Sequence, residues 1–193
     1  MSFILSNLKA TVLCSFLLAF LFIYTLTIGD FDKTAFSMWL LRWLHVISAI
    51  MWVGILYYFN FVQIPNMGKI PDEQKPAISK VIAPASLFWF RWGSVATVLT
   101  GLKLAYLNGY LHQALTFSEG FWGIGLGMWL GIIMFINVWG VIWPNQKRAL
   151  GIIEVDEETK AKSARTAMLF SRTNTLLSIP MLVGMTVAQN SFA

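Results

Sequence analysis

The stretch from Trp39 to Pro65 holds the residues whose types and spacing best suit chemistry. This apolar stretch contains His45, and Arg42 precedes it by one helical turn. A histidine inside a hydrophobic span is costly to keep without a partner, so by default it marks a functional site. A neutral imidazole can ligate haem iron. Arg42 lies on a similar helix face, about 4.5 Å away along the axis, where it can pair with a haem propionate.

Two residues outside this stretch are further candidates for the same site. Lys103, near the end of a later apolar run, can neutralise a propionate from another helix. His112 is the only other histidine and lies in the connector that follows. It is one candidate for the second axial ligand of the iron, and another loop residue is the alternative. Aromatic residues are expected to provide flat apolar walls near His45, namely Trp39, Trp43, Trp52, Phe59 and Phe61.

The residues leave two simpler interpretations open. His45 can donate a hydrogen bond to a carbonyl or hydroxyl group on a neighbouring helix and do nothing more. The metal can also be copper, because histidine and methionine both bind it. Met51, Met128 and Met134 lie in apolar runs, where packing against lipid is the alternative role for a methionine.

The composition is that of an integral membrane protein. Of the 193 residues, 57% are hydrophobic and 12% are charged, whereas charged residues are about a quarter of an average soluble domain. Cys14 is the only cysteine, which excludes disulfides within the chain and a CxxCH haem-attachment motif. The net charge of +5 indicates membrane orientation and not nucleic-acid binding, because no basic run is long or interleaved with aromatic residues.

Five apolar runs predict an all-α bundle of five transmembrane helices that forms a single membrane domain over residues 1–193. Pro65 is expected to end the second helix, because proline lacks a backbone N–H. A secretory signal peptide is the alternative interpretation of the first run, although no A-x-A site follows it. The predicted spans are about 10–28, 35–64, 82–107, 121–143 and 166–189.

The lysine and arginine residues of the loops predict the orientation of this bundle. Most of them lie in two loops: residues 65–81 hold Lys69, Lys75 and Lys80, and residues 144–165 hold Lys147, Arg148, Lys160, Lys162 and Arg165. The N-terminus is therefore expected in the cytoplasm and the C-terminus outside, in a bacterial-type inner membrane. Polar residues in the cytoplasmic half are expected to tie the helices together, namely Asn60, Gln63, Arg91, Asn137, Arg172 and Asn174.

Glycines recur every four residues in the fourth predicted span, at Gly123, Gly127 and Gly131. In lipid, small residues at this spacing let two helix backbones approach closely. The pattern predicts either tight packing within the chain or a face for homo-oligomer formation.

Several segments resemble the N-terminal membrane domain of the PuuD-type bacterial urate oxidases. The resemblance rests on WLHVISAIMWVGILYYFNFVQIP, LFWFRWGSVATVLTGLKLAYL, NVWGVIWPNQKRALG and SRTNTLLSIPMLVGM, and it covers roughly residues 36–189. Full-length members carry a C-terminal cytochrome c domain, and none is expected in this sequence. The resemblance implies a membrane module that passes electrons to a separate cytochrome c, and not a complete urate oxidase on its own.

The sequence is also similar, more loosely, to the HemJ-type protoporphyrinogen oxidases, which bind haem b. The order of His45, Trp52, Gly54, Tyr57 and Tyr58 matches the first helix of that family. The family also uses a lysine ligand in a helix that corresponds to residues 121–143, where this sequence has no lysine. The shared histidine implies haem b as the cofactor.

The first functional hypothesis is a haem b protein of electron transfer or oxidation, an oxidoreductase module with His45 as the iron ligand. The alternative is a non-catalytic accessory or assembly subunit of a larger membrane complex, such as a respiratory or oxidase complex. A transporter is a third possibility, but no acidic residue lies in any predicted span, and five helices provide no inverted repeat.

Overall fold

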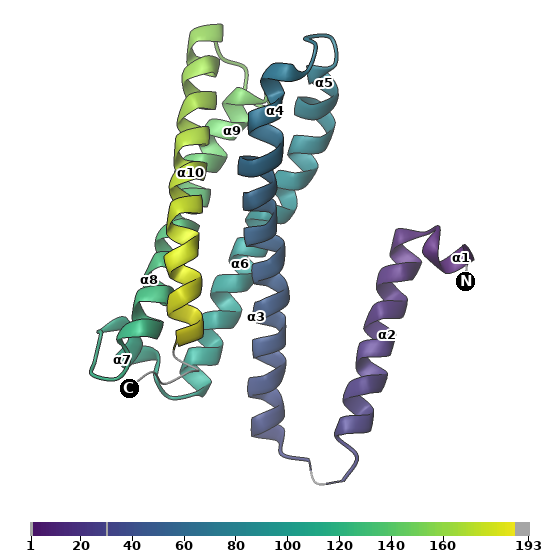
Figure 1. The fold of residues 1–193 in the computed structure, drawn as a ribbon, viewed down its shortest axis with the longest axis vertical. Helices are drawn as coiled ribbons and strands as arrows, with labels where there is room; N and C mark the ends of the chain where they lie inside the picture. The colour runs from purple at the N-terminus through teal and green to yellow at the C-terminus, as the bar shows by residue number, and fades with distance from the viewer. Residues whose placement is uncertain (1, 30, 188–193) are drawn as a thin grey trace. The chain divides into compact units, whose positions relative to one another are not determined.

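The computed structural model describes residues 2–29 and 31–187, and in these ranges it contains helices and no strand (Figure 1). Three helices of the described residues are long and apolar enough to cross a membrane: Leu8–Leu26, Lys33–Lys69 and Trp122–Ala149. The predicted all-α class is thus confirmed for the described residues, and these three helices have the length and composition of transmembrane helices. The chain divides into two units, Met1–Trp39 and Leu40–Ala193.

The first unit contains α1 (Ser2–Leu5), α2 (Leu8–Leu26) and the first residues of α3 (Lys33–Tyr57). Asn7 caps α2, because its side-chain oxygen accepts hydrogen bonds from the backbone N–H groups of Lys9 and Ala10 at 3.0 and 3.3 Å. No residue of α2 is buried. A helix that is apolar on all sides and yet exposed suits a lipid environment.

The second unit is built from the rest of α3, three further long helical segments and short connecting helices. The elements after α3 are η1 (Tyr58–Gln63), α4 (Ile64–Asn66), η2 (Met67–Lys69), α5 (Lys75–Ala77), η3 (Ile78–Ile82), α6 (Ala83–Leu107), α7 (Leu111–Leu115), α8 (Trp122–Ile136), η4 (Asn137–Ile142), α9 (Trp143–Ala149) and α10 (Glu157–Val187). The long helices lie on the predicted runs. The last helix begins earlier than predicted, at Glu157, and residues 188–189 of that predicted span lie outside the described part.

Pro65 does not end its helix, contrary to the prediction, because the backbone widens before it. The π-helical segments η1, η3 and η4 each end two residues before a proline, namely Pro65, Pro84 and Pro144. A proline ring clashes with the carbonyl group four residues earlier and offers no N–H group. The wider π turn relieves that clash and lets a new α-helical turn begin, in which an N–H group is not needed.

One hydrophobic core joins four long helical segments of the second unit. It contains Trp52 and Leu56 of α3, Phe90 of α6, Met134 of α8 and Met181 of α10, all buried. A smaller cluster of Ala105, Ala114 and Met128 joins the end of α6 to α7 and α8. These two clusters hold the helices that carry the candidate site.

Buried polar side chains add hydrogen bonds between these helices, as the sequence predicted for several of them. Asn174 on α10 is fully buried and donates to the Met134 carbonyl oxygen at 2.9 Å, while it accepts a hydrogen bond from Asn137 at 2.9 Å. Asn60 in η1 donates to Ser171 on α10 at 2.8 Å. The prediction that polar side chains join the helices through hydrogen bonds is confirmed for Asn60, Asn137 and Asn174.

The glycine pattern of α8 is used inside the chain. A Cβ atom at Gly127 would lie 3.0 Å from the Gly184 carbonyl carbon on α10, and one at Gly123 would lie 3.3 Å from the Val187 side chain. Figure 1 shows α8 and α10 side by side. The close approach of these backbones agrees with the packing interpretation of the pattern. Gly131 is buried and has no atom within 4 Å of its Cβ position.

Candidate functional site

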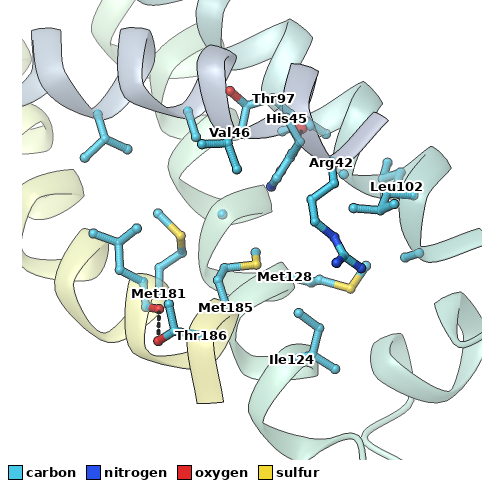
Figure 2. Close-up of a pocket in the computed structure, with 18 of the residues that line it drawn as sticks. Arg42, His45, Val46, Thr97, Leu102, Ile124, Met128, Met181, Met185 and Thr186 are labelled. Atoms are coloured by element: carbon cyan, nitrogen blue, oxygen red, sulfur yellow. Dashed lines mark hydrogen bonds between the residues drawn. The ribbon is translucent and has the colours of Figure 1, made fainter. Parts of the chain in front are cut away.

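A cavity of about 720 Å³ lies between α3, α6, α8 and α10 in the second unit, and it is partly open (Figure 2). Its volume is within the range of about 300–1,000 Å³ that is typical of small-molecule and cofactor sites. Most of the lining is apolar, with a small number of polar side chains. Figure 2 shows Arg42 and His45 entering the cavity from α3. Arg42 and His45, the two candidate residues of the Trp39–Pro65 stretch, therefore both line this cavity.

His45 is held by α6 in a fixed tautomer. Its Nδ1 atom lies 2.8 Å from the Thr97 carbonyl oxygen and 3.3 Å from the Thr100 hydroxyl oxygen. A carbonyl oxygen can only accept, so Nδ1 carries the proton and donates it to Thr97. The lone pair therefore belongs to Nε2, to which no residue of the described part is hydrogen-bonded. Metal-ligating histidines characteristically donate their other N–H in this way.

Gly101 sets the position of the imidazole ring. A Cβ atom at this position would lie 2.7 Å from His45 Cε1 and 3.0 Å from His45 Nδ1. The ring of His45 thus lies against the bare backbone of α6, one turn after Thr97. Glycine at position 101 is what permits the hydrogen bond between His45 and Thr97.

The Gly101→Ala variant is expected to lose a ligand bound at His45 while it keeps its fold. The added methyl group displaces the ring from the Thr97 carbonyl oxygen, and loss of such a supporting contact costs about 10–100-fold in affinity. The clash is with a side chain and not with backbone, so the melting temperature should change little. Haem content per chain and thermal unfolding in detergent measure the two effects. Gly140→Ala is the control, because no atom lies within 4 Å of that Cβ position. Equal haem content in both variants would contradict the role given to Gly101.

Arg42 brings a positive charge to one end of the cavity, beside the connector between α6 and α8. Tyr110 of that connector also lines the cavity. Burial raises the pKa of Tyr110 above its usual value, and the positive charge of Arg42 opposes this rise. Arg42 is therefore close enough to influence the phenol group. A cation at the edge of an apolar cavity suits an anionic group on a largely apolar ligand.

Comparisons with models of known families, with curated proteins and with solved structures find no match. The function proposed below therefore rests on the geometry of the second unit and on the sequence pattern. Both centre on the cavity beside His45.

The structure separates two other predicted site residues from this cavity. Lys103 is exposed, with its Nζ atom 5.1 Å from the ring centre of Tyr106, and it does not line the cavity. His112 is exposed on α7 and does not line it either. Of the predicted aromatic walls, Trp52 lines the cavity and Phe59 packs in the core. His45 and Arg42 are therefore the two predicted ligand-binding residues that the structure brings together.

Sequence reasoning missed several residues of the site: Thr97, Gly101, Tyr110, Met181 and Met185, all of which line the cavity. Thr97 acts through its backbone carbonyl group, which no sequence pattern reveals. The two methionines are four residues apart on α10, and such spacing does place them on one helix face. That spacing was the one available signal.

Several features of the cavity fit a haem group. His45 offers an imidazole nitrogen of fixed tautomer, and Arg42 offers a charge for a propionate. Trp52 is 1% exposed, and its Nε1 atom has no hydrogen-bond partner among the described residues. No group of three or more His, Cys, Asp or Glu side chains in the described part could hold a bare metal ion. A haem needs no such group, because the porphyrin supplies four ligands and the protein supplies only axial ones.

Proposed function

We propose that this chain is a membrane protein that binds haem b through His45 and works in electron transfer or oxidation with a separate redox partner. One observation carries the proposal: His45 donates Nδ1–H to the Thr97 carbonyl oxygen at 2.8 Å, beside a cavity of about 720 Å³. A packing histidine needs the hydrogen bond but not the cavity. A site for a single copper ion needs ligands but no space of this size.

Each residue of the site has a separate task in this proposal. His45 would hold the haem iron through Nε2, and the hydrogen bond to Thr97 keeps its ring oriented with Nδ1 as the protonated nitrogen of the neutral imidazole. Arg42 neutralises a propionate at the polar edge. The apolar walls exclude water, which favours binding of the porphyrin plane. Haem iron changes between the ferrous and ferric states, so the bound cofactor would supply one-electron chemistry.

The proposed membrane arrangement has five spans, with the N-terminus in the cytoplasm and the C-terminus outside. The lysine-rich and arginine-rich loops on one side support this orientation. The helices α6 and α10 would provide the third and fifth spans beside the three apolar ones. His45, in the first half of the helical span Lys33–Lys69, and Met185, near the end of α10, would then both lie in the outer half of the bilayer. A bacterial-type inner membrane with a soluble cytochrome c outside fits this arrangement and the resemblance to the urate oxidase membrane domain.

The proposal is tested with the whole chain, purified in mild detergent from haem-replete cells. A pyridine haemochrome assay should find haem b in an amount equal to that of the chain. After reduction, the protein should pass its electron to oxidised soluble cytochrome c, seen as loss of the reduced b-type band and gain of the reduced c-type band. A folded but colourless protein that co-purifies with larger subunits would contradict the proposal and favour an accessory subunit.

A further inference from the structure

We infer that the thioether sulfur of Met185 is the second axial ligand of the haem. This inference rests on the proposed function and adds the residue that faces His45 across the cavity. Met128 of α8 and Met181 and Met185 of α10 all line the cavity. Figure 2 shows their side chains reaching the same space as the His45 ring, from the helices across from α3.

The other polar groups of the cavity are poorer candidates. Arg42 has no lone pair to offer. The Tyr57 hydroxyl group is engaged with the Ser178 hydroxyl group at 2.9 Å. Tyr110 would have to bind as a phenolate, and burial opposes its ionisation. The hydroxyl groups of threonines are weak ligands of haem iron, which takes His, Cys, Met or Tyr. The methionine sulfurs remain, and a thioether is a soft, neutral donor.

Packing distinguishes Met185 from the other two methionines. Met181 belongs to the large core and is 5% exposed, and Met128 belongs to the smaller cluster and is 8% exposed. Met185 is only partly buried and packs against both clusters. Its side chain therefore lies at the boundary of the two clusters and keeps surface free for a ligand. Most of the surface of Met128 and Met181 is instead covered by protein contacts.

The neighbouring residues on α10 place the Met185 side chain without crowding it. Gly184 lets α10 approach the α8 backbone at Gly127, and this approach puts the α10 side chains at the wall of the cavity. Met181, one turn earlier on the same wall, is the more buried of the two. In the proposed bond, Met185 Sδ donates a lone pair to the iron, and no proton moves, because a thioether is neutral at every pH. A His and Met pair of ligands raises the reduction potential of the iron.

The test compares three matched variants of the whole purified protein: Met185→Leu, Met181→Leu and Met128→Leu. The wild type is expected to show low-spin ferric haem with the near-infrared charge-transfer band of sulfur-ligated iron. Met185→Leu should lose that band, become high-spin by electron paramagnetic resonance, keep its haem through His45 and show a lower midpoint potential. The other two variants should keep the band, because leucine conserves the packing volume of methionine.

A fourth variant distinguishes loss of the iron ligand from a change in packing. Met185→His should restore low-spin haem without the sulfur band, because imidazole replaces the thioether on the same iron position. Survival of the band in Met185→Leu, or its loss in Met181→Leu or Met128→Leu instead, overturns the assignment of Met185. A wild-type haem without the sulfur band overturns this inference and leaves the proposed function intact, whereas a wild type without haem overturns both.

Discussion

His45→Ala is expected to purify as a folded but colourless protein. Without the imidazole, the haem loses its strongest bond to the chain. Removal of a mere supporting residue costs about 10–100-fold in metal affinity, so loss of the ligand itself should cost more than about 100-fold. The fold should persist, because His45 is only partly buried and its hydrogen bonds within the described residues join it to one other helix, α6. The Soret absorbance relative to protein absorbance measures the effect.

The matched control is His112→Ala, which removes the other histidine from an exposed position on α7. It should keep the haem content of the wild type. Exogenous imidazole added to His45→Gly should restore part of the Soret band, because the space left by the side chain admits the free ligand. If His45→Ala retained full haem content, His45 would be a packing residue and not the iron ligand.

Gly184→Ala should lower the stability of the helix bundle by about 2 kcal/mol. The added Cβ atom would lie 2.7 Å from the Gly123 carbonyl oxygen, 2.7 Å from the Gly127 nitrogen and 2.9 Å from the Gly127 Cα atom. All three are backbone atoms, so α8 and α10 must separate, at a cost near the upper end of the roughly 1–3 kcal/mol seen for overpacking. Alanine gains back about 1 kcal/mol through its higher helix propensity.

The expected fall in melting temperature is about 4–8 °C for a chain of this size. Gly140→Ala provides a control with the opposite sign, because no atom lies within 4 Å of that Cβ position and only the propensity gain applies. Circular dichroism in detergent follows both variants. A Gly184→Ala protein as stable as Gly140→Ala would show that α8 and α10 do not approach through Gly184.

The positions of the long helices were predictable in outline, because each lies on one of the predicted runs, but α10 begins earlier, at Glu157 in the charged stretch before its run. His45 also stands out in the sequence, since a histidine in an apolar span is rare and costly. The continuation of the helix past Pro65 was not predictable. A proline ends a helix or is accommodated by a π turn according to the packing of the preceding residues.

The hydrogen-bond partners of His45 could not be predicted from the sequence, for a physical reason. The hydrogen bond to Thr97 joins a side chain to a backbone carbonyl group on a helix far along the chain. Every residue has such a carbonyl group, so none stands out. Lys103 shows the converse case. Its charge and depth suggested a propionate partner, but the turn of α6 directs it to Tyr106 and away from the cavity.

The difference spectrum of the purified wild-type chain, dithionite-reduced minus air-oxidised, tests the central proposal most directly. The proposed site at His45 predicts a Soret shift and an α band of b-type haem, retained in His112→Ala and absent in His45→Ala. A folded wild-type protein from haem-replete cells without these bands would contradict haem binding at this cavity.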